Sequence, residues 1–466
     1  MRRDTPTFRR LAIVLTAAIF ALGFAAPVPA PAALAGGNQL WTASYHGQQS
    51  GEAGATAEAV SPGGRTVFVT GFTGYTAQDG STGWATLAYN TATGARRWLR
   101  TYRGSDTSPT AVDGATSIAV SPDGSTVFAG GFVTNSGGVS AIETIAYSAA
   151  TGVTLWARQY TADGADSPVT MAVTADGSAV YVMTQDYRTL AYRAATGRFL
   201  WASPAKGLGS NSFAAAGALA PDGSRLYVTG VSLGKNGEEY QSVAYDAATG
   251  AMVWVRRLAG PAAGISYNAT SVAVSRDGST VLVAGYVNGG AGSNPIVGYD
   301  STTGATVWTK QWLPTSSGYC CETVSLGVSP NGSTMFVTGV GGGGFNPGFY
   351  ETQAREVSTG ALVWSRTCCT SEGSGSLIAA SPDGSAVFTS GYLANNEGTD
   401  AYATVSYGAA TGTEHWEATY SGPHPTRGAV DPAAIAVSPD GSKVFVTGQA
   451  PQGSNQDSFT TVAYGT

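Results

Sequence analysis

An internal repeat constrains the fold of this chain more than any other feature of its sequence. A turn of the type Ser-Pro-Asp-Gly-Ser recurs eight times at intervals of 46 to 60 residues. A second marker, a Thr-Gly pair whose Gly is followed four residues later by Trp, alternates with it. A fixed period of this length is typical of repeat architectures, in which each repeat is one supersecondary unit. The glycines of the first marker are Gly64, Gly124, Gly177, Gly223, Gly278, Gly332, Gly384 and Gly441.

The segments between the markers alternate apolar and polar residues with a period of two, which is the period of β-strands. One segment precedes each first turn and one follows it, a third precedes the Thr-Gly turn, and a fourth carries the Trp. Helical periodicity is absent from these segments. Eight units of four short strands predict an all-β, eight-bladed β-propeller of four-stranded antiparallel blades. The 431 residues from 36 to 466 supply about 54 per blade, so we expect a single propeller domain over 36–466.

The two ends of the repeat array complement each other. The last repeat stops in its third strand, at TTVAYGT, and has no Trp-bearing fourth strand. Residues 40–45, LWTASY, resemble the fourth-strand segments and precede the first complete unit. We therefore expect the N-terminal strand to complete the last blade and close the ring, which would remove exposed sheet edges.

Residues 1–35 have the pattern of a signal peptide. Four arginines precede an apolar run at 11–26, and small residues precede Gly36. The run is shorter than the roughly 20 residues that a membrane-spanning helix needs. We therefore expect a secreted, extracellular protein without a membrane span.

The charge balance disfavours nucleic acid as a partner. The chain has 24 Lys and Arg against 30 Asp and Glu, whereas nucleic-acid binders normally present a basic surface. We expect a monomer whose ligand is a protein or a glycan.

The repeated Trp residues are predicted to pack between neighbouring blades, because a flat ring inserted between two sheets buries a large apolar area. Their motif, as in residues 244–254 (AYDAATGAMVW), resembles the tryptophan-docking motif of quinoprotein alcohol dehydrogenase-like, PQQ-like repeat propellers. That resemblance implies eight blades and, in the enzymes of the family, pyrroloquinoline quinone (PQQ) held with Ca²⁺. The first turn and the strand after it also resemble the YVTN and WD40-like repeats of secreted propellers, most of which are not enzymes. The predicted docking residues are Trp41, Trp98, Trp156, Trp201, Trp254, Trp308, Trp364 and Trp416.

Binding residues are expected on one face of the ring. The first and third connections of each blade are short, stereotyped turns on one face, so the variable loops lie on the other. Acids just upstream of the innermost strands could project over the channel mouth and bind Ca²⁺, which takes six to eight oxygen ligands. These candidates are Asp113, Asp166, Glu322, Glu372 and Asp431. Trp312 and Tyr319 are candidates for stacking on a sugar or quinone ring, with ordinary packing as the alternative.

The cysteines form two adjacent pairs, Cys320-Cys321 and Cys368-Cys369, in a chain expected to be exported. Cross-links between the pairs would constrain a long loop, whereas bridges within each pair would need no approach of the two loops. Both connectivities stay open, as do free thiols. The family resemblance adds that quinoprotein alcohol dehydrogenases carry a vicinal disulfide over the cofactor, which draws attention to Cys320-Cys321.

Two functions follow from these patterns. The first is a binding or scaffold module that acts through its loop-rich face. The alternative is a PQQ- and calcium-dependent alcohol or sugar dehydrogenase. No catalytic residue or cofactor ligand set can be assigned by motif.

Overall fold

A computed structural model describes the chain from residue 36 onward with gaps in the connections between strands. The described residues are 36–47, 53–74, 82–106, 108, 111–136, 138–161, 167–203, 212–235, 237–262, 264–288, 294–312, 325–341, 349–368, 373–394, 400–423, 430–451 and 457–466. All regular elements among them are β-strands. None of the described residues forms a helix long and apolar enough to cross a membrane.

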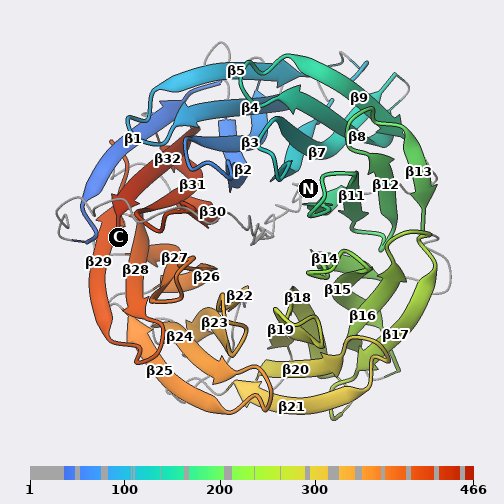
Figure 1. The fold of residues 1–466 in the computed structure, drawn as a ribbon, viewed down its shortest axis with the longest axis vertical. Coiled ribbons are helices and arrows are strands. Elements are labelled where there is room, and N and C mark those ends of the chain that lie inside the picture. The colour runs from blue at the N-terminus through green and yellow to red at the C-terminus, as the bar shows by residue number, and fades with distance from the viewer. Residues whose placement is uncertain are drawn as a thin grey trace, which may run out of the picture.

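The strands form eight four-stranded antiparallel sheets, which are the blades of a propeller arranged around a central opening (Figure 1). Blade 1 consists of β2 (Ala53–Val60), β3 (Thr66–Gly74), β4 (Thr82–Asn90) and β5 (Arg96–Tyr102). Blade 2 consists of β6 (Gly114–Val120), β7 (Thr126–Asn135), β8 (Val139–Ser148) and β9 (Thr154–Tyr160). Blade 3 consists of β10 (Pro168–Val173), β11 (Ala179–Thr184), β12 (Thr189–Arg193) and β13 (Phe199–Ala202). Blade 4 consists of β14 (Phe213–Leu219), β15 (Arg225–Leu233), β16 (Glu238–Asp246) and β17 (Met252–Leu258).

The second half of the ring repeats this plan. Blade 5 consists of β18 (Ser266–Val274), β19 (Thr280–Asn288), β20 (Asn294–Asp300) and β21 (Thr306–Trp312). Blade 6 consists of β22 (Ser325–Val328), β23 (Thr334–Gly341), β24 (Phe349–Glu356) and β25 (Leu362–Cys368). Blade 7 consists of β26 (Gly373–Ala380), β27 (Ala386–Ala394), β28 (Asp400–Gly408) and β29 (Glu414–Tyr420). Blade 8 consists of β30 (Asp431–Val437), β31 (Lys443–Pro451), β32 (Asp457–Gly465) and β1 (Gln39–Tyr45).

Blade 8 joins the two ends of the chain. Its strand order is β1-β32-β31-β30, and β1 pairs antiparallel with β32 in a register that places Trp41 opposite Ala463 and Tyr45 opposite Phe459. The predicted fold class and the closure of the ring by the N-terminal strand are therefore confirmed. Figure 1 shows β1, in blue, lying outside β32, in red.

The repeated Trp residues lie at the contacts between successive blades. Trp98 lies in β5 of blade 1, and its indole Nε1–H donates to the carbonyl of Ala149 in blade 2 at 2.9 Å. The ring packs between Phe68 of its own blade and Tyr147 of the next. Six of the eight indoles make the equivalent bond within the described residues, and their acceptors are the carbonyls of Thr91, Ala149, Ala194, Ser301, Val357 and Ala409.

Seven of the eight docking Trp residues also lie against the glycine of the Thr-Gly turn in the next blade. At Gly152 φ is +70°, a conformation that favours glycine, and a Cβ there would lie 2.7 Å from Cδ2 of Trp98. Trp416 of blade 7 packs in the same way against Gly37, just before β1. The glycines that meet Trp41 through Trp416 in this way are Gly94, Gly152, Gly197, Gly250, Gly304, Gly360, Gly412 and Gly37.

Four blades add an arginine to this contact, two residues after the Trp. Arg100 donates from Nε to the carbonyl of Gly152 and from Nη2 to the carbonyl of Thr151, both at 2.8 Å. Arg158, Arg256 and Arg366 bond the corresponding two carbonyls of the following blade. A planar guanidinium fork suits two adjacent carbonyls, so these residues fix one blade against the next.

Candidate functional site

The ring has two unlike faces. We call the face with the first and third connections of each blade the turn face, and the opposite one the loop face. Exposed large apolar side chains occur on the loop face at Val112, Val139, Phe213 and Leu233, near the connections of blades 1 to 4. Single exposed apolar residues are ordinary, but these four lie on the face whose connections differ from blade to blade.

The inner strands provide the wall of the channel. The bulged residue Thr56 of β2 donates its hydroxyl to the carbonyl of Ala115 in the next blade at 2.7 Å, and Thr116 does the same to Pro168 at 2.7 Å. These bonds tie successive inner strands together. Within the described inner strands the only acids or bases are Glu58 and Asp431. The wall is therefore built from small, apolar and hydroxyl-bearing residues.

Asp113, the first of the candidate acids, is held by backbone groups. Its side chain is fully buried, and its carboxylate accepts backbone N–H bonds from Gly104 and Thr134, each at 2.6 Å. Burial raises the pKa of Asp113 although these two bonds lower it. In this structure Asp113 fastens the link between blades 1 and 2 to β7, and a role as a ligand at the channel mouth stays a prediction.

The other acidic candidates are not brought together by the described residues. Asp431 begins β30, lies opposite Gln449 in the ladder and is exposed. Asp166, Glu322 and Glu372 lie outside the described residues. The described part of the chain contains no group of three or more His, Cys, Asp or Glu side chains that could hold a metal ion.

Trp312 packs in the core instead of presenting a stacking surface. It ends β21, is fully buried, and clusters with Trp308, Leu326 and Met335 across blades 5 and 6. The packing alternative describes the place of Trp312 in this structure, and the stacking role stays a prediction. Tyr319 lies outside the described residues.

Of the four cysteines, only Cys368 belongs to the described residues. It ends β25 opposite Tyr350 in the ladder and is buried. Cys320, Cys321 and Cys369 lie outside those residues, so the connectivity stays a prediction.

Two buried acids were not singled out from the sequence. Glu58 of β2 is buried where the other inner strands carry residues such as Ile118, Leu326 and Ile435, and burial raises its pKa well above the usual value. Glu143 of β8 is buried beside Gln159, whose Nε2 donates to it at 3.3 Å, and burial raises its pKa to about 7. A charged residue at a repeat position that is otherwise apolar is the signal that could have identified Glu58.

Comparison with known families gives one match over most of the chain. The family model described as outer membrane protein assembly factor BamB, a PQQ-like repeat model, matches residues 30–214, 141–319 and 208–438. The three matches overlap and together cover well over half of the sequence. No curated protein matches the chain.

Solved structures with a similar fold include a eukaryotic propeller. The crystal structure of Sqt1 from Chaetomium thermophilum has a TM-score of 0.60 and 13% identity, over 92% of this chain and 98% of that one. The same protein bound to the N-terminus of the ribosomal protein L10 has a TM-score of 0.58 and 13% identity, over 91% and 98%. At this identity the likeness shows the propeller fold alone.

Proposed function

Because the chain belongs to the PQQ-like repeat propellers described by the BamB family model, we propose that it is an exported binding or scaffold module that holds a protein or glycan on its loop face. The observation that carries this proposal is the difference between the two faces of the ring: one has short, regular turns and the other has variable connections. Stereotyped turns, docking tryptophans and arginine bonds make the ring rigid, while the connections that differ most in length and sequence lie on the loop face, where Val112, Val139, Phe213 and Leu233 are exposed.

A rigid scaffold with variable loops suits recognition, because the scaffold positions the binding residues without further ordering. The family model is named for an assembly factor, a role that requires contact with another protein. The amino-terminal segment 1–35, with its signal peptide pattern, supports export.

The dehydrogenase alternative finds no support in the described residues. A PQQ–calcium site needs oxygen ligands for the ion and charged groups around the quinone. Asp113 is committed to backbone N–H groups, the described acids form no ligand cluster, and the channel wall is almost uncharged. These residues do not fit the cofactor, so we assign no step through it.

Site-specific photo-crosslinking tests the proposal. A crosslinking amino acid is placed at Val139 or Leu233 on the loop face, and at Val153 or Val307 beside the third turns as matched controls. The four side chains are similarly exposed, at 50%, 53%, 56% and 54% respectively. The variants are incubated with secreted and envelope proteins of the producing organism. A glycan array tests whether the ligand is a glycan.

The proposal predicts one adduct common to both loop-face positions and absent from both controls, and direct binding of the purified partner. A glycan whose binding is lost on substitution of loop-face residues also supports it. Adducts of the same partner at the two control positions alone would contradict the proposal.

A further inference from the structure

The rim of the ring carries a sector of exposed apolar side chains at its turn-face edge. In blades 2 to 6 the residue directly before the docking Trp is Leu155, Leu200, Val253, Val307 or Val363, and each is 37% to 54% exposed. These residues lie at the start of the outer strands β9, β13, β17, β21 and β25, which Figure 1 shows on the circumference of the ring. Large apolar side chains exposed at the same place in five consecutive blades indicate an interaction surface, whereas single scattered ones are ordinary.

The backbone of this sector is not suited to pairing with a further β-strand. Trp156 lies opposite Ala146 and Thr154 lies opposite Tyr147, so Leu155 is the extra residue of a β-bulge. The same register shift occurs before the Trp in blades 3 to 6. A bulge interrupts the ladder of an edge strand. A partner would therefore contact the apolar side chains and not the strand backbone.

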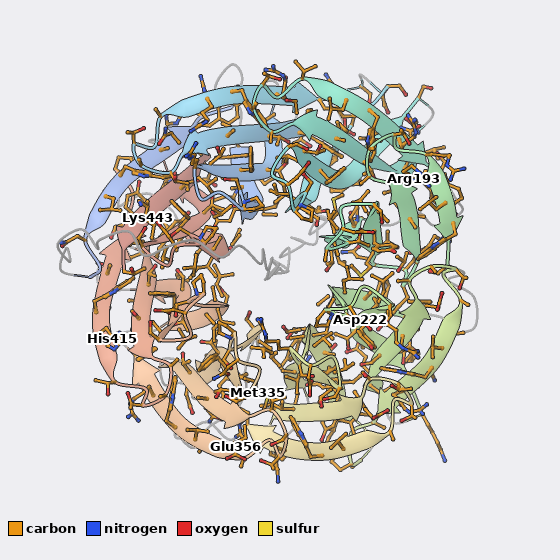
Figure 2. The ribbon with its side chains drawn as sticks, viewed as in Figure 1. Arg193, Asp222, Met335, Glu356, His415 and Lys443 are labelled. Carbon is orange, nitrogen blue, oxygen red and sulfur yellow. The ribbon has the colours of Figure 1, made fainter. Side chains whose placement is uncertain are left out.

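The two blades that border this sector are oppositely charged. In blade 1 the two residues before the Trp are Arg96 and Arg97, and in blade 7 they are Glu414 and His415. All four are exposed, and within the described residues Arg96, Arg97 and Glu414 take part in no ion pair. Figure 1 shows the outer strands of these blades, β5 and β29, on either side of β1, and Figure 2 labels His415 at the outer edge of blade 7.

The charge difference extends over the turn-face connections of these two blades. Blade 1 adds Arg65 in its first turn and has no acid in either turn, whereas blade 7 adds Asp383 and has no base in either turn. Arg366 of blade 6 reaches the third turn of blade 7, where its guanidinium bonds the carbonyls of Gly412 and Thr411. Blade 1 is therefore basic and blade 7 acidic on this face.

The other six blades are close to neutral on the turn face. Blades 2, 4, 5 and 6 each have one more acid than base in and beside their two turns, and a base two residues after the Trp offsets it. In blade 4, for example, Asp222 and Asp246 are balanced by Arg225 and Arg256. Blade 3 has one more base than acid, and blade 8 has one of each. The strongest opposite charges of this face are therefore those of blades 1 and 7.

We propose that the turn face of this propeller docks on the turn face of a second copy of the chain. A two-fold axis in the plane of the ring, through blades 4 and 8, would place blade 1 of each copy on blade 7 of the other. The same axis would place the apolar blades on one another, blade 2 on blade 6, blade 3 on blade 5 and blade 4 on itself. A two-fold interface requires a self-complementary surface of this kind. Arg96 of one copy then faces Glu414 of the other, twice in the dimer.

Carboxylates on this face disfavour an anionic lipid surface as the occupant. Hydrogen bonds within the first turns lower the pKa values of Asp123, Asp176 and Asp277, so these groups stay ionised at neutral pH. The first turns follow the innermost strands, and Figure 2 labels Asp222, in one of them, beside the central opening. Repulsion between these carboxylates across the dimer limits its affinity, so we expect dissociation in the micromolar range.

A dimer of this kind would present its two loop faces in opposite directions. The interface lies on the face opposite to the proposed partner surface, so the proposal goes beyond the proposed function and its test is independent of it. It differs from the monomer expected from the sequence.

Sedimentation equilibrium of the purified protein over a series of concentrations tests the proposal. Arg96→Glu and Glu414→Arg change equivalent positions in the two charged blades, and the double variant exchanges their charges. Met252→Thr removes an apolar side chain at the two-fold axis, at a position where blades 2 and 5 carry threonine. Leu233→Thr is the matched control on the loop face, with a side chain 53% exposed against 41% for Met252.

We expect a monomer–dimer equilibrium whose dissociation constant rises about tenfold in each single charge variant, because attraction becomes repulsion at two contacts. The double variant should return to within about threefold of the parent, which also shows that the substituted chains fold. Met252→Thr should weaken the dimer about fivefold, and Leu233→Thr should leave it unchanged.

A parent protein that stays monomeric at every concentration would overturn the proposal. A double variant as weak as the single variants, or a dimer weakened only by Leu233→Thr, would also overturn it. A monomer that sediments with phosphatidylglycerol vesicles would overturn it in favour of a lipid surface.

Discussion

Replacing Gly152 with alanine should destabilise the propeller much more than replacing Gly124, although both glycines are in turns of blade 2. Their φ angles are +70° and +71°, so the backbone strain of an L-residue is the same, about 1–2 kcal/mol. A Cβ at Gly124 would meet only Cδ of Pro62, at 3.5 Å, which is ordinary contact. A Cβ at Gly152 would lie 2.7 Å from Cδ2 and 2.9 Å from Cε3 of Trp98.

Trp98 cannot move away easily, because its ring is buried between Phe68 and Tyr147 and its indole N–H is bonded to Ala149. Overpacking of this kind costs about 1–3 kcal/mol beyond the strain. We therefore expect losses of about 2–5 kcal/mol for Gly152→Ala and about 1–2 kcal/mol for Gly124→Ala. Urea unfolding followed by tryptophan fluorescence measures both. Equal losses for the two variants would refute the docking role of the Trp–glycine contact.

Three further perturbations test other parts of the account. Deleting residues 36–46 removes β1 and the contact of Trp416 with Gly37, so the midpoint of thermal unfolding should fall sharply, and an unchanged midpoint would rule out closure of the ring by β1. The folded-state pKa of Glu143, about 7, exceeds the unfolded value near 4.5, so the folded state binds more protons between these values and stability falls as pH rises through this window. In the parent protein this titration lowers the free energy of unfolding by up to about 3 kcal/mol as pH rises through the window, and Glu143→Gln should abolish that decrease. Identical pH profiles of stability for the variant and the parent would contradict this. Peptide mapping without reduction tests the hypothesis that Cys320-Cys321 and Cys368-Cys369 are cross-linked to each other: peptides joined between the pairs are expected, and bridges only within each pair would contradict it.

The architecture was accessible from the sequence because it depends on features that occur eight times. The turn glycines, the strand period and the Trp series each recur with every blade, and the missing fourth strand of the last repeat specified the closure by residues 40–45. The arginine two residues after Trp was equally visible at Arg100, Arg158, Arg256 and Arg366, but its role depends on carbonyls in the next blade. Such contacts between distant residues have no local signature.

The candidate site was less accessible because it depends on positions that do not repeat. Asp113 precedes an inner strand, which suggested the channel mouth, yet its carboxylate is directed to Gly104 and Thr134 by the path of the link between blades 1 and 2. Trp312 falls outside the docking series but is buried by the sheet of blade 6.

The central proposal is that this propeller recognises a partner on its loop face, with a PQQ- and calcium-dependent dehydrogenase as the alternative. Fluorescence titration of the purified protein, from residue 36 onward, with PQQ in the presence and absence of Ca²⁺ tests it most directly, together with a dye-linked screen of alcohol and sugar oxidation. We expect no saturable quenching and no dye reduction under either condition. Calcium-dependent, saturable binding accompanied by dye reduction would contradict it and identify the protein as a quinone-dependent dehydrogenase.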